Sequence, residues 1–208
     1  MESDKFSIRL ATAKDLDQIV ETHIDAFPGF FITLLGRSFI KTMYRFFLVR
    51  SEVVFLVAES NIGVFCFAVG WFGDRSKQRL LLLIYIPFLC VSVLPALFRN
   101  PIAIGTKLWA RMRAKDGTPE LPKNVLYLSS IGLKRSCWGR GVANDILAAF
   151  EAKGRERKVS AVILTTDADN NERTLAFYKK CGYKITQLYK QDNLRKMLVM
   201  SKHLQTET

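Results

Sequence analysis

Apolar and polar positions alternate with two different periods in the first part of the chain. Residues 6–10 switch between apolar and polar at every step, which is typical of a half-buried strand. Thr12 with Asp15 three positions later resembles a capping box and predicts a helix over 15–27, with apolar side chains on one face. The Pro-Gly pair at 28–29 ends that helix. The chain therefore begins with a strand and an amphipathic helix.

The spacing of apolar residues further along predicts a second helix and two hairpins. Apolar side chains between residues 34 and 47 recur at helical spacing. Runs of β-branched and aromatic residues separated by short polar turns then predict antiparallel strand pairs. The paired strands are 53–58 with 62–71, joined by 59–61, and 184–189 with 197–202.

A strand, a glycine loop and a helix follow one another in the second half. Residues 125–133 form an apolar, strand-like run, and apolar positions from Val142 to Phe150 mark a helix face. Gly139 and Gly141 lie in the loop between them. The first N–H groups of a helix lack internal partners and lie at the positive end of its dipole, so this loop predicts a pyrophosphate site. Basic side chains gather there: Lys134, Arg135 and Arg140.

A second block completes a family pattern. Its residues are Asn171, Thr174, Tyr178, Gly182 and Tyr183. Together with the loop, this block resembles the GNAT superfamily of acyl-CoA-dependent N-acetyltransferases. The loop pattern of that family is Gln/Arg-x-x-Gly-x-Gly/Ala after a strand that ends in a Val-like residue. Leu133 takes the Val position, Gly139 and Gly141 are the two glycines, and Ser136 stands where the family has Gln or Arg.

The resemblance implies an α/β (α+β) fold of the GNAT type. Its centre is a mixed, mostly antiparallel sheet of six to seven strands flanked by about four helices. The element order along the chain agrees, with an apolar helical insertion between the third and fourth strands. A chain of 208 residues predicts one N-acetyltransferase domain over residues 1–208. Within it, the insertion covers about 73–122 and the acetyl-CoA-binding core about 124–190.

The insertion contains a long uncharged run at residues 80–98. An unbroken helix there would be roughly 28 Å long, close to the thickness of a bilayer core. Pro87 and Pro95 interrupt it, and a span would place two strands of one sheet on opposite sides of a membrane. We therefore expect kinked helices that do not span. Two interpretations stay open: packing against the domain or a second subunit, or a flap on an anionic membrane surface. The membrane-surface interpretation rests on the basic residues that flank the apolar run: Arg75, Lys77, Arg79, Arg99, Lys107, Arg111, Arg113 and Lys115.

The chain is strongly basic, with 31 Lys and Arg against 19 Asp and Glu, a net charge of +12 and a pI of about 9.7. Nucleic acid is disfavoured as a partner, because no helix-turn-helix pattern, RNP-like sequence or aromatic-basic interleaving is present. A membrane surface or an acidic acceptor fits the charge better, and a simply solvated basic surface stays open.

The spacing of the cysteines indicates whether the chain binds a metal, and the first residues indicate its place in the cell. The four cysteines show no Cys-x-x-Cys pairing and no histidine at metal spacing, so we expect no metal site, no disulfide framework and reduced thiols. The start is acidic and polar rather than basic and then apolar, so no signal peptide is expected. These features predict a cytoplasmic protein, with a peripheral position at the inner membrane face left open.

Acetyl transfer to an amine needs a neutral nucleophile, a stabilised oxyanion and a proton for the leaving thiolate. The resemblance implies that the fourth and fifth strands part and that the pantetheine arm pairs with the fourth. It makes Tyr178 the general acid, and gives Asn171 a hydrogen bond to the cofactor arm or a helix cap. The cofactor-binding set it implies is Ile131, Leu133, Trp138, Gly139, Arg140, Gly141, Val142, Ala143, Asn171 and Tyr178.

The general base is less defined. Many family members carry Glu on the fourth strand, whereas strand 125–133 offers Ser129 and Ser130 and no carboxylate. Asp167, at the carboxyl end of the predicted fifth strand, is the first candidate, and ordered water is a further route. The other candidates are Asp169 and, on the first helix, His23 and Asp25.

These observations predict an N-acetyltransferase that moves an acetyl group from acetyl-CoA to a primary amine of a small molecule or amino sugar, which a lipid carrier at the membrane could present. Two alternatives stay open. One is a protein or peptide N-acetyltransferase that recognises acidic residues around the acceptor. The other is a non-catalytic acyl-CoA-binding module, which the missing carboxylate and Ser136 would fit. A homodimer is also open.

Overall fold

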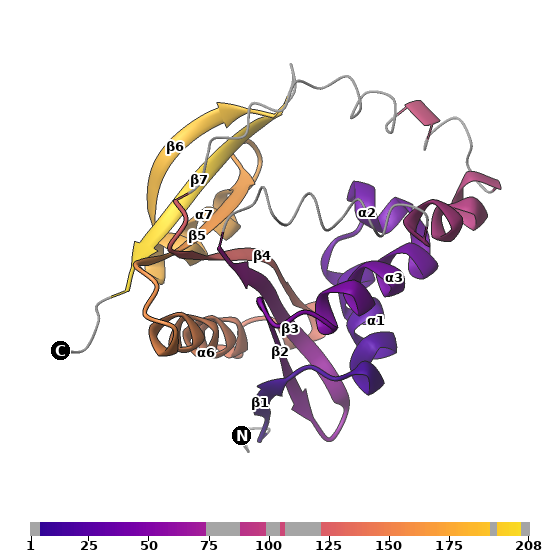
Figure 1. Cartoon of the computed structure of the whole chain (residues 1–208), viewed down its shortest axis with the longest axis horizontal. Coiled ribbons are helices and arrows are strands. Elements are labelled where there is room, and N and C mark those ends of the chain that lie inside the picture. Colours follow the sequence, from indigo (N-terminus) through magenta and orange to yellow (C-terminus); the bar gives the residue numbers. More distant parts are fainter. Residues whose placement is uncertain (1–4, 74–87, 99–104, 107–121, 192–194, 205–208) are drawn as a thin grey trace.

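The computed structural model describes residues 5–73, 88–98, 105–106, 122–191 and 195–204. Its centre is a seven-stranded sheet in the order β1-β2-β3-β4-β5-β7-β6, which confirms the predicted fold class (Figure 1). Neighbouring strands run antiparallel except for the parallel pair β4 and β5. The strands are β1 Ser7–Leu10, β2 Val53–Ser60, β3 Gly63–Phe72, β4 Val125–Leu133, β5 Ala161–Asp167, β6 Lys184–Lys190 and β7 Lys196–His203.

Helices cover both faces of the sheet. One face of the sheet packs on α1 and α3, which lie over β2 and β3. The opposite face of the sheet packs on α6 and α7 (Figure 1). Each layer is closed by apolar side chains at the predicted helical spacing. The helices are α1 Leu16–Ala26, α2 Phe31–Leu34, α3 Gly36–Leu48, α6 Val142–Glu156 and α7 Glu172–Lys180, with short 3-10 turns η1 Ala13–Asp15 and η2 Arg135–Cys137.

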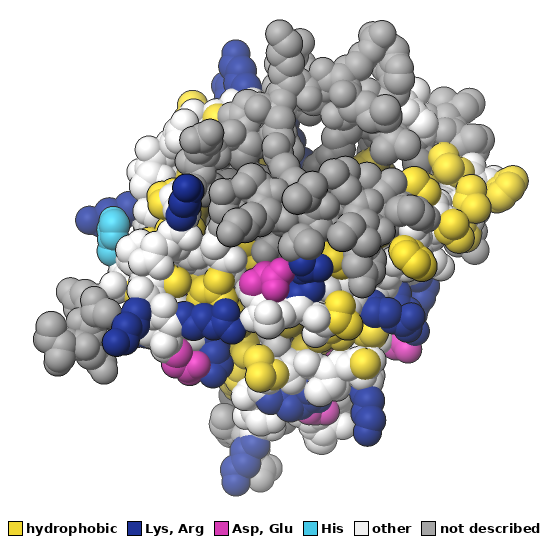
Figure 2. Space-filling view, in the orientation of Figure 1, with side chains coloured by type: hydrophobic (Ala, Val, Ile, Leu, Met, Phe, Trp, Pro, Cys, Tyr) yellow, Lys and Arg dark blue, Asp and Glu magenta, His cyan; other side chains and the backbone are white. Residues whose placement is uncertain are grey.

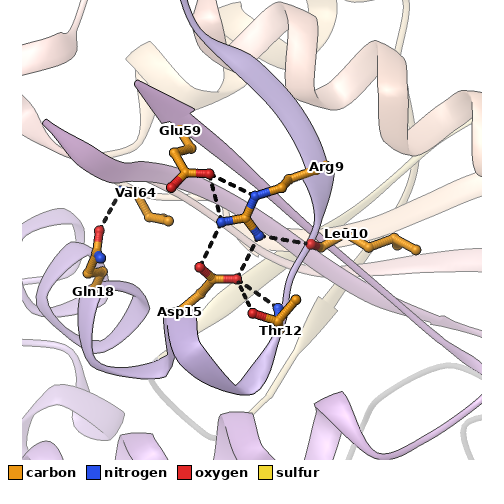
Figure 3. Close-up of polar contacts among 7 residues, drawn as sticks. All are labelled: Arg9, Leu10, Thr12, Asp15, Gln18, Glu59 and Val64. Carbon is orange, nitrogen blue, oxygen red and sulfur yellow. Dashed lines mark hydrogen bonds and ion pairs between the residues drawn. The ribbon is translucent and has the colours of Figure 1, made fainter. Parts of the chain in front are cut away.

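An ion-pair network fixes the start of the chain to the β2–β3 hairpin (Figure 3). The Arg9 guanidinium donates to both oxygens of Asp15, at 2.7 and 2.8 Å, and to Glu59 at 2.7 Å. The Thr12 backbone N–H and hydroxyl also donate to Asp15, which confirms the predicted capping box. These contacts, of which the hydrogen bonds from Arg9 have the largest effect, lower the pKa of the Asp15 carboxyl to about 2. On the adjoining turn of α1, Gln18 accepts the N–H of Val64 at 2.6 Å.

The hairpin turn and the insertion differ in part from the sequence prediction. The first hairpin turns at 61–62 rather than 59–61, because β2 extends to Ser60 and β3 begins at Gly63 with φ +87°. Residues 88–98 form one helix that continues through Pro95, so the predicted interruption at Pro95 is wrong. The rest of the apolar run, 80–87, lies outside the described residues.

The 88–98 helix packs on the rest of the protein through one side only. Ala96 is buried against Leu35, and the surrounding contacts come from Val93, Leu97, Phe31 and Phe39. This helix therefore adds a small apolar cluster at α2 and α3, so for residues 88–98 the packing is on the domain, one of the two interpretations left open above. Among the described residues, no helix has the length and apolar character needed to cross a bilayer.

Candidate active site

Strands β4 and β5 separate halfway along their length. They pair from Val125–Ala161 to Leu128–Leu164. Beyond that point β4 stays paired with β3 as far as Leu133, and β5 stays paired with β7 as far as Asp167. The pairing of β3 with β4 shifts by one residue at Ser129, between the partners of Val69 and Gly70. This bulge bends β4 away from β5, so backbone groups of β4 face a gap, as the family resemblance implies.

The loop after β4 presents helix N–H groups at the mouth of this gap. Gly139 and Gly141 both have φ near +80°, and a Cβ on either would meet no atom within 4 Å. Gly141 is the N-cap residue of the fifteen-residue helix α6. The N–H groups of Val142 and Ala143 are at the positive end of the helix dipole. No other described atom therefore covers the backbone at these two glycines.

Trp138 connects this loop to α7. Its indole N–H donates to the Leu133 carbonyl at 3.3 Å, and the Arg173 guanidinium lies 4.0 Å from the centre of its ring. The contact is a cation–π interaction across the cofactor side of the gap. No sequence pattern singled out Arg173, although it lies two residues after Asn171. Arg140, also in the predicted cofactor set, is exposed.

Asn171 and Tyr178, the two residues predicted from the second block, lie at the start and near the end of α7. Tyr178 is buried in α7, edge-on to Tyr183, and burial raises the pKa of its phenol. Asn171 occupies the N-cap position of α7, but its side chain forms no cap. Its amide instead donates to Thr166 at 2.7 Å and to the Asp167 carbonyl at 3.0 Å. The predicted cap at Asn171 is therefore wrong, because the end of β5 engages the amide group.

The acidic candidates for the base differ in their surroundings. Asp167 forms two hydrogen bonds with Arg195, the residue before β7, at 2.5 and 2.7 Å. Asp25, in the last turn of α1, accepts the backbone N–H of Arg135 at 2.6 Å. Asp169 is exposed in the loop after β5. The Asp167 carboxylate is thus positioned at the end of β5 as predicted, but as half of an ion pair.

His23 lies inside the protein rather than on a cleft wall. Its side chain is 3% exposed, and its Nδ1 is 2.7 Å from the Tyr44 hydroxyl. Burial lowers the pKa of the imidazole to about 4. The ring packs against Phe27 and, nearly parallel, against Phe67. At neutral pH His23 is therefore uncharged.

Two tyrosines lie on the side of the sheet that packs on α1 and α3. Tyr44 of α3 is fully buried there, with its hydroxyl 2.7 Å from the His23 Nδ1. Farther back, the Tyr127 hydroxyl is 2.6 Å from Thr165 of β5, and Trp71 stacks obliquely on Tyr127. In the sequence, Ser130 stood out only as a place without a carboxylate. Tyr44 was missed, because an aromatic residue on a buried helix face has no pattern that marks it as polar.

The described part of the chain holds no cluster of metal-ligating side chains. No group of three or more His, Cys, Asp or Glu side chains lies close enough to hold an ion there. All four cysteines are free thiols: Cys66, Cys90, Cys137 and Cys181.

A family model matches the part of the chain that carries this geometry. Residues 99–183 match the acetyltransferase (GNAT) family model, which spans the parted strand β4, the glycine loop and the Asn171 block. No curated protein sequence gives a significant match to the chain.

Solved structures share the fold across nearly the whole chain. The PaiA N-acetyltransferase from Thermoplasma acidophilum, in complex with coenzyme A, has a TM-score of 0.60 at 14% identity, covering 96% of this chain and 99% of its own. An N-acetyltransferase from Staphylococcus aureus Mu50 has a TM-score of 0.62 at 16% identity, with 97% and 99% covered. A ribosomal-protein-alanine N-acetyltransferase from Brucella melitensis has a TM-score of 0.60 at 19% identity, with 95% and 99% covered. At these identities the likeness concerns the fold.

Proposed function

Because the chain belongs to the GNAT family of acetyltransferases, we propose that it transfers an acetyl group from acetyl-CoA to the primary amine of a small molecule or amino sugar. The observation that carries this proposal is the parting of β4 and β5 next to the glycine loop. The same opening then has a free edge of β4 and the N-terminus of α6. The strand edge can pair with the amide groups of the pantetheine arm, and the helix N-terminus can bind the pyrophosphate.

Acetyl-CoA fits the residues of this opening. The bare backbone at Gly139 and Gly141 allows phosphate oxygens to approach the N–H groups that begin α6. Arg140 supplies positive charge beside them. Ile131 and Leu133 present the β4 backbone beyond the last pair with β5. The protein from Thermoplasma acidophilum with this fold has coenzyme A bound, which supports the choice of co-substrate.

Tyr178 is the proposed proton donor for the leaving thiolate. It projects from α7 and is buried on the α6 and α7 side of the sheet. The burial that raises its pKa keeps the phenol protonated at neutral pH, as a general acid must be before the reaction. Asn171, held by the end of β5, is available through its amide oxygen to a second group on the cofactor side.

Two of the acidic candidates for proton removal from the amine are already engaged. Asp167 is neutralised by Arg195, and Asp25 is bound to the loop backbone. We therefore keep Asp167 as a base only for a state in which Arg195 is displaced. Ordered water is the alternative route, since it needs no dedicated side chain.

We further propose that the acceptor amine is presented at a membrane surface. The 88–98 helix exposes apolar side chains on its outer face: Phe88 64%, Val91 67%, Leu94 47% and Phe98 87%. Figure 2 shows hydrophobic side chains gathered at the right edge, where Figure 1 places this helix. Basic residues flank the run in the sequence, and the net charge is +12. An apolar helix face in a basic protein suits the surface of an anionic bilayer.

Thiol release from acetyl-CoA, measured with a panel of amines, amino sugars and peptides, tests the activity. Acetylation of small amines or amino sugars with little turnover of peptides is the expected result. Selective turnover of peptides with free amino termini would replace the acceptor assignment with the protein-acetyltransferase alternative. If coenzyme A binds but no amine is acetylated, the chain is instead an acyl-CoA-binding module.

A further inference from the structure

A pair of hydroxyl groups joins β4 to β5 at the point where the two strands part. The Tyr127 hydroxyl of β4 is 2.6 Å from the Thr165 Oγ1 of β5. The ladder between the strands ends at the pair Leu128–Leu164, one residue beyond Tyr127. Thr165 is therefore the first residue of β5 after the ladder. The hydroxyl pair lies at the narrow end of the gap between β4 and β5.

Thr165 and the proposed cofactor residues lie on opposite sides of the sheet. The next residue, Thr166, accepts a hydrogen bond from the Asn171 amide at 2.7 Å. Because side chains alternate along a strand, Thr165 projects to the other side. Its partner Tyr127 belongs to an apolar cluster separate from the one that contains Tyr178. A thioester in the gap would therefore have the Tyr178 phenol on one side and the Thr165 hydroxyl on the other.

Neighbouring rings hold the Tyr127 phenol in place. Trp71 of β3 pairs directly with Tyr127 in the sheet, and their ring centres are 4.8 Å apart. Phe47 of α3 stacks on Trp71 at 6.1 Å. Tyr127 is 5% exposed, whereas Thr165 is half-buried. The phenol is therefore a fixed partner, and Thr165 is the member of the pair that a bound molecule can contact.

Asp167 continues the same side of β5 beyond Thr165. Alternation places it two residues on, about 7 Å along the strand, a separation that a single sugar ring with its substituents spans. Arg195 donates to both oxygens of the Asp167 carboxylate, at 2.5 and 2.7 Å. Each oxygen can accept a further hydrogen bond. Because Arg195 balances the negative charge, an uncharged donor such as a hydroxyl group suits this position.

We propose that Thr165 binds the acceptor amine and that Asp167 binds a hydroxyl group near that amine, so that the acceptor is an amino sugar or another amine with a hydroxyl group close to it. Tyr127 is a positioning residue that holds the Thr165 hydroxyl. The inference rests on the proposed function. Whichever hydroxyl of the pair donates, Thr165 keeps at least one lone pair for an amine N–H. An amine that donates there keeps its nitrogen lone pair for a thioester in the gap.

Glucosamine is the probe for binding, measured by calorimetric titration of the protein saturated with coenzyme A. Thr165→Val should weaken glucosamine binding about tenfold, because one hydrogen bond is lost, whereas Thr165→Ser should retain the affinity. Tyr127→Phe should have a smaller effect, and none when added to Thr165→Val, because it acts through Thr165. Thr186→Val is the matched control, since it removes a strand hydroxyl that donates to the Val199 carbonyl. Unchanged affinity in Thr165→Val, or additive losses for Thr165→Val and Tyr127→Phe, would overturn the assignment.

Steady-state kinetics test the role of Asp167. Asp167→Ala should raise the KM for glucosamine about tenfold with little change in kcat or in the KM for acetyl-CoA. Asp167→Asn, which keeps an acceptor oxygen, should lose less. A fall in kcat at unchanged KM would make Asp167 the base and remove it from acceptor binding. Thr165→Val and Tyr127→Phe should likewise raise the KM for glucosamine and leave the KM for acetyl-CoA within about twofold.

A second amine tests the substrate class. Cyclohexylamine has no hydroxyl group, so its kcat/KM, corrected for the fraction of free amine, should be at least about tenfold lower than that of glucosamine. Equal values would overturn the class. If the wild type binds glucosamine with the variant effects above but acetylates no amine, the proposed function fails and the acceptor site stands. If it acetylates amines and Thr165→Val changes nothing, this inference alone fails.

Discussion

The Asp25 carboxylate, in the last turn of α1, accepts a 2.6 Å hydrogen bond from the backbone N–H of Arg135, 110 residues further along the chain. Arg135 begins the short η2 turn that leads into the glycine loop. One bond therefore connects the helix expected to border the acceptor site with the loop expected to hold the cofactor. A carboxylate at this N–H also satisfies a donor that would otherwise be unpaired at the start of the turn.

Two replacements of Asp25 distinguish the effect of its hydrogen bond to Arg135 from the effect of its negative charge. Asp25→Ala removes both and should lower the free energy of unfolding by about 1 kcal/mol and weaken coenzyme A binding, because the loop loses its anchor. Asp25→Asn keeps an acceptor oxygen and should retain most of the stability. Thermal unfolding and calorimetric titration with coenzyme A measure both effects. Equal losses in the two variants would assign the effect to charge and not to the hydrogen bond.

Gly141→Asp tests the cofactor loop. The new side chain puts a negative charge where phosphates are expected, so coenzyme A affinity should fall by several kcal/mol while the fold survives. Gly29→Asp is the matched control, since Gly29 also has a positive φ, +77°, and a Cβ added there would meet no atom within 4 Å. Both variants share a backbone cost of about 1 kcal/mol. Calorimetry should show lost affinity only in Gly141→Asp, and unchanged affinity there would move the cofactor site elsewhere.

Tyr178→Phe tests the proton donor. Removal of the hydroxyl should lower kcat on the order of a hundredfold and change coenzyme A affinity little, because the proton is needed only as the thiolate leaves. Tyr189→Phe, at a buried tyrosine of β6, should leave kcat nearly unchanged. Equal turnover of Tyr178→Phe and wild type would leave Tyr178 with a packing role alone.

Acid stability should depend on Asp15. The contact with Arg9 depresses its pKa from 3.8 to about 2, so the stabilisation is complete above pH 3.8 and disappears as pH falls toward 2. The shift corresponds to about 2 kcal/mol. Denaturant unfolding between pH 2 and pH 6 should show this slope in wild type and a shallower one in Asp15→Asn. Asp17→Asn should change the slope much less, because solvent screens the exposed pair of Asp17 with Lys41 that lowers the pKa of that carboxyl.

Local patterns predicted the elements well because local physics produces them. The apolar run at 125–133 and the face from Val142 define β4 and the start of α6 at the expected residues. Contacts between elements that are distant in the sequence could not be predicted from such local patterns. The pairing of Asp167 with Arg195 and of His23 with Tyr44 depends on how the sheet and helices come together, which the spacing of residues does not encode.

The outer face of the 88–98 helix gives the last prediction. Vesicles containing anionic lipid should retain the protein at low salt and release it at high salt, because screening weakens the attraction of its basic residues. Neutralising Arg75, Lys77 and Arg79 together should also release it. Val91→Ser with Leu94→Ser removes two apolar side chains from the exposed face and should abolish binding, whereas Ile62→Ser, at an equally exposed apolar residue of the β2–β3 turn, should not. A dimer in solution that the Val91→Ser and Leu94→Ser changes dissociate, without any vesicle binding, would instead make this face a contact between two copies.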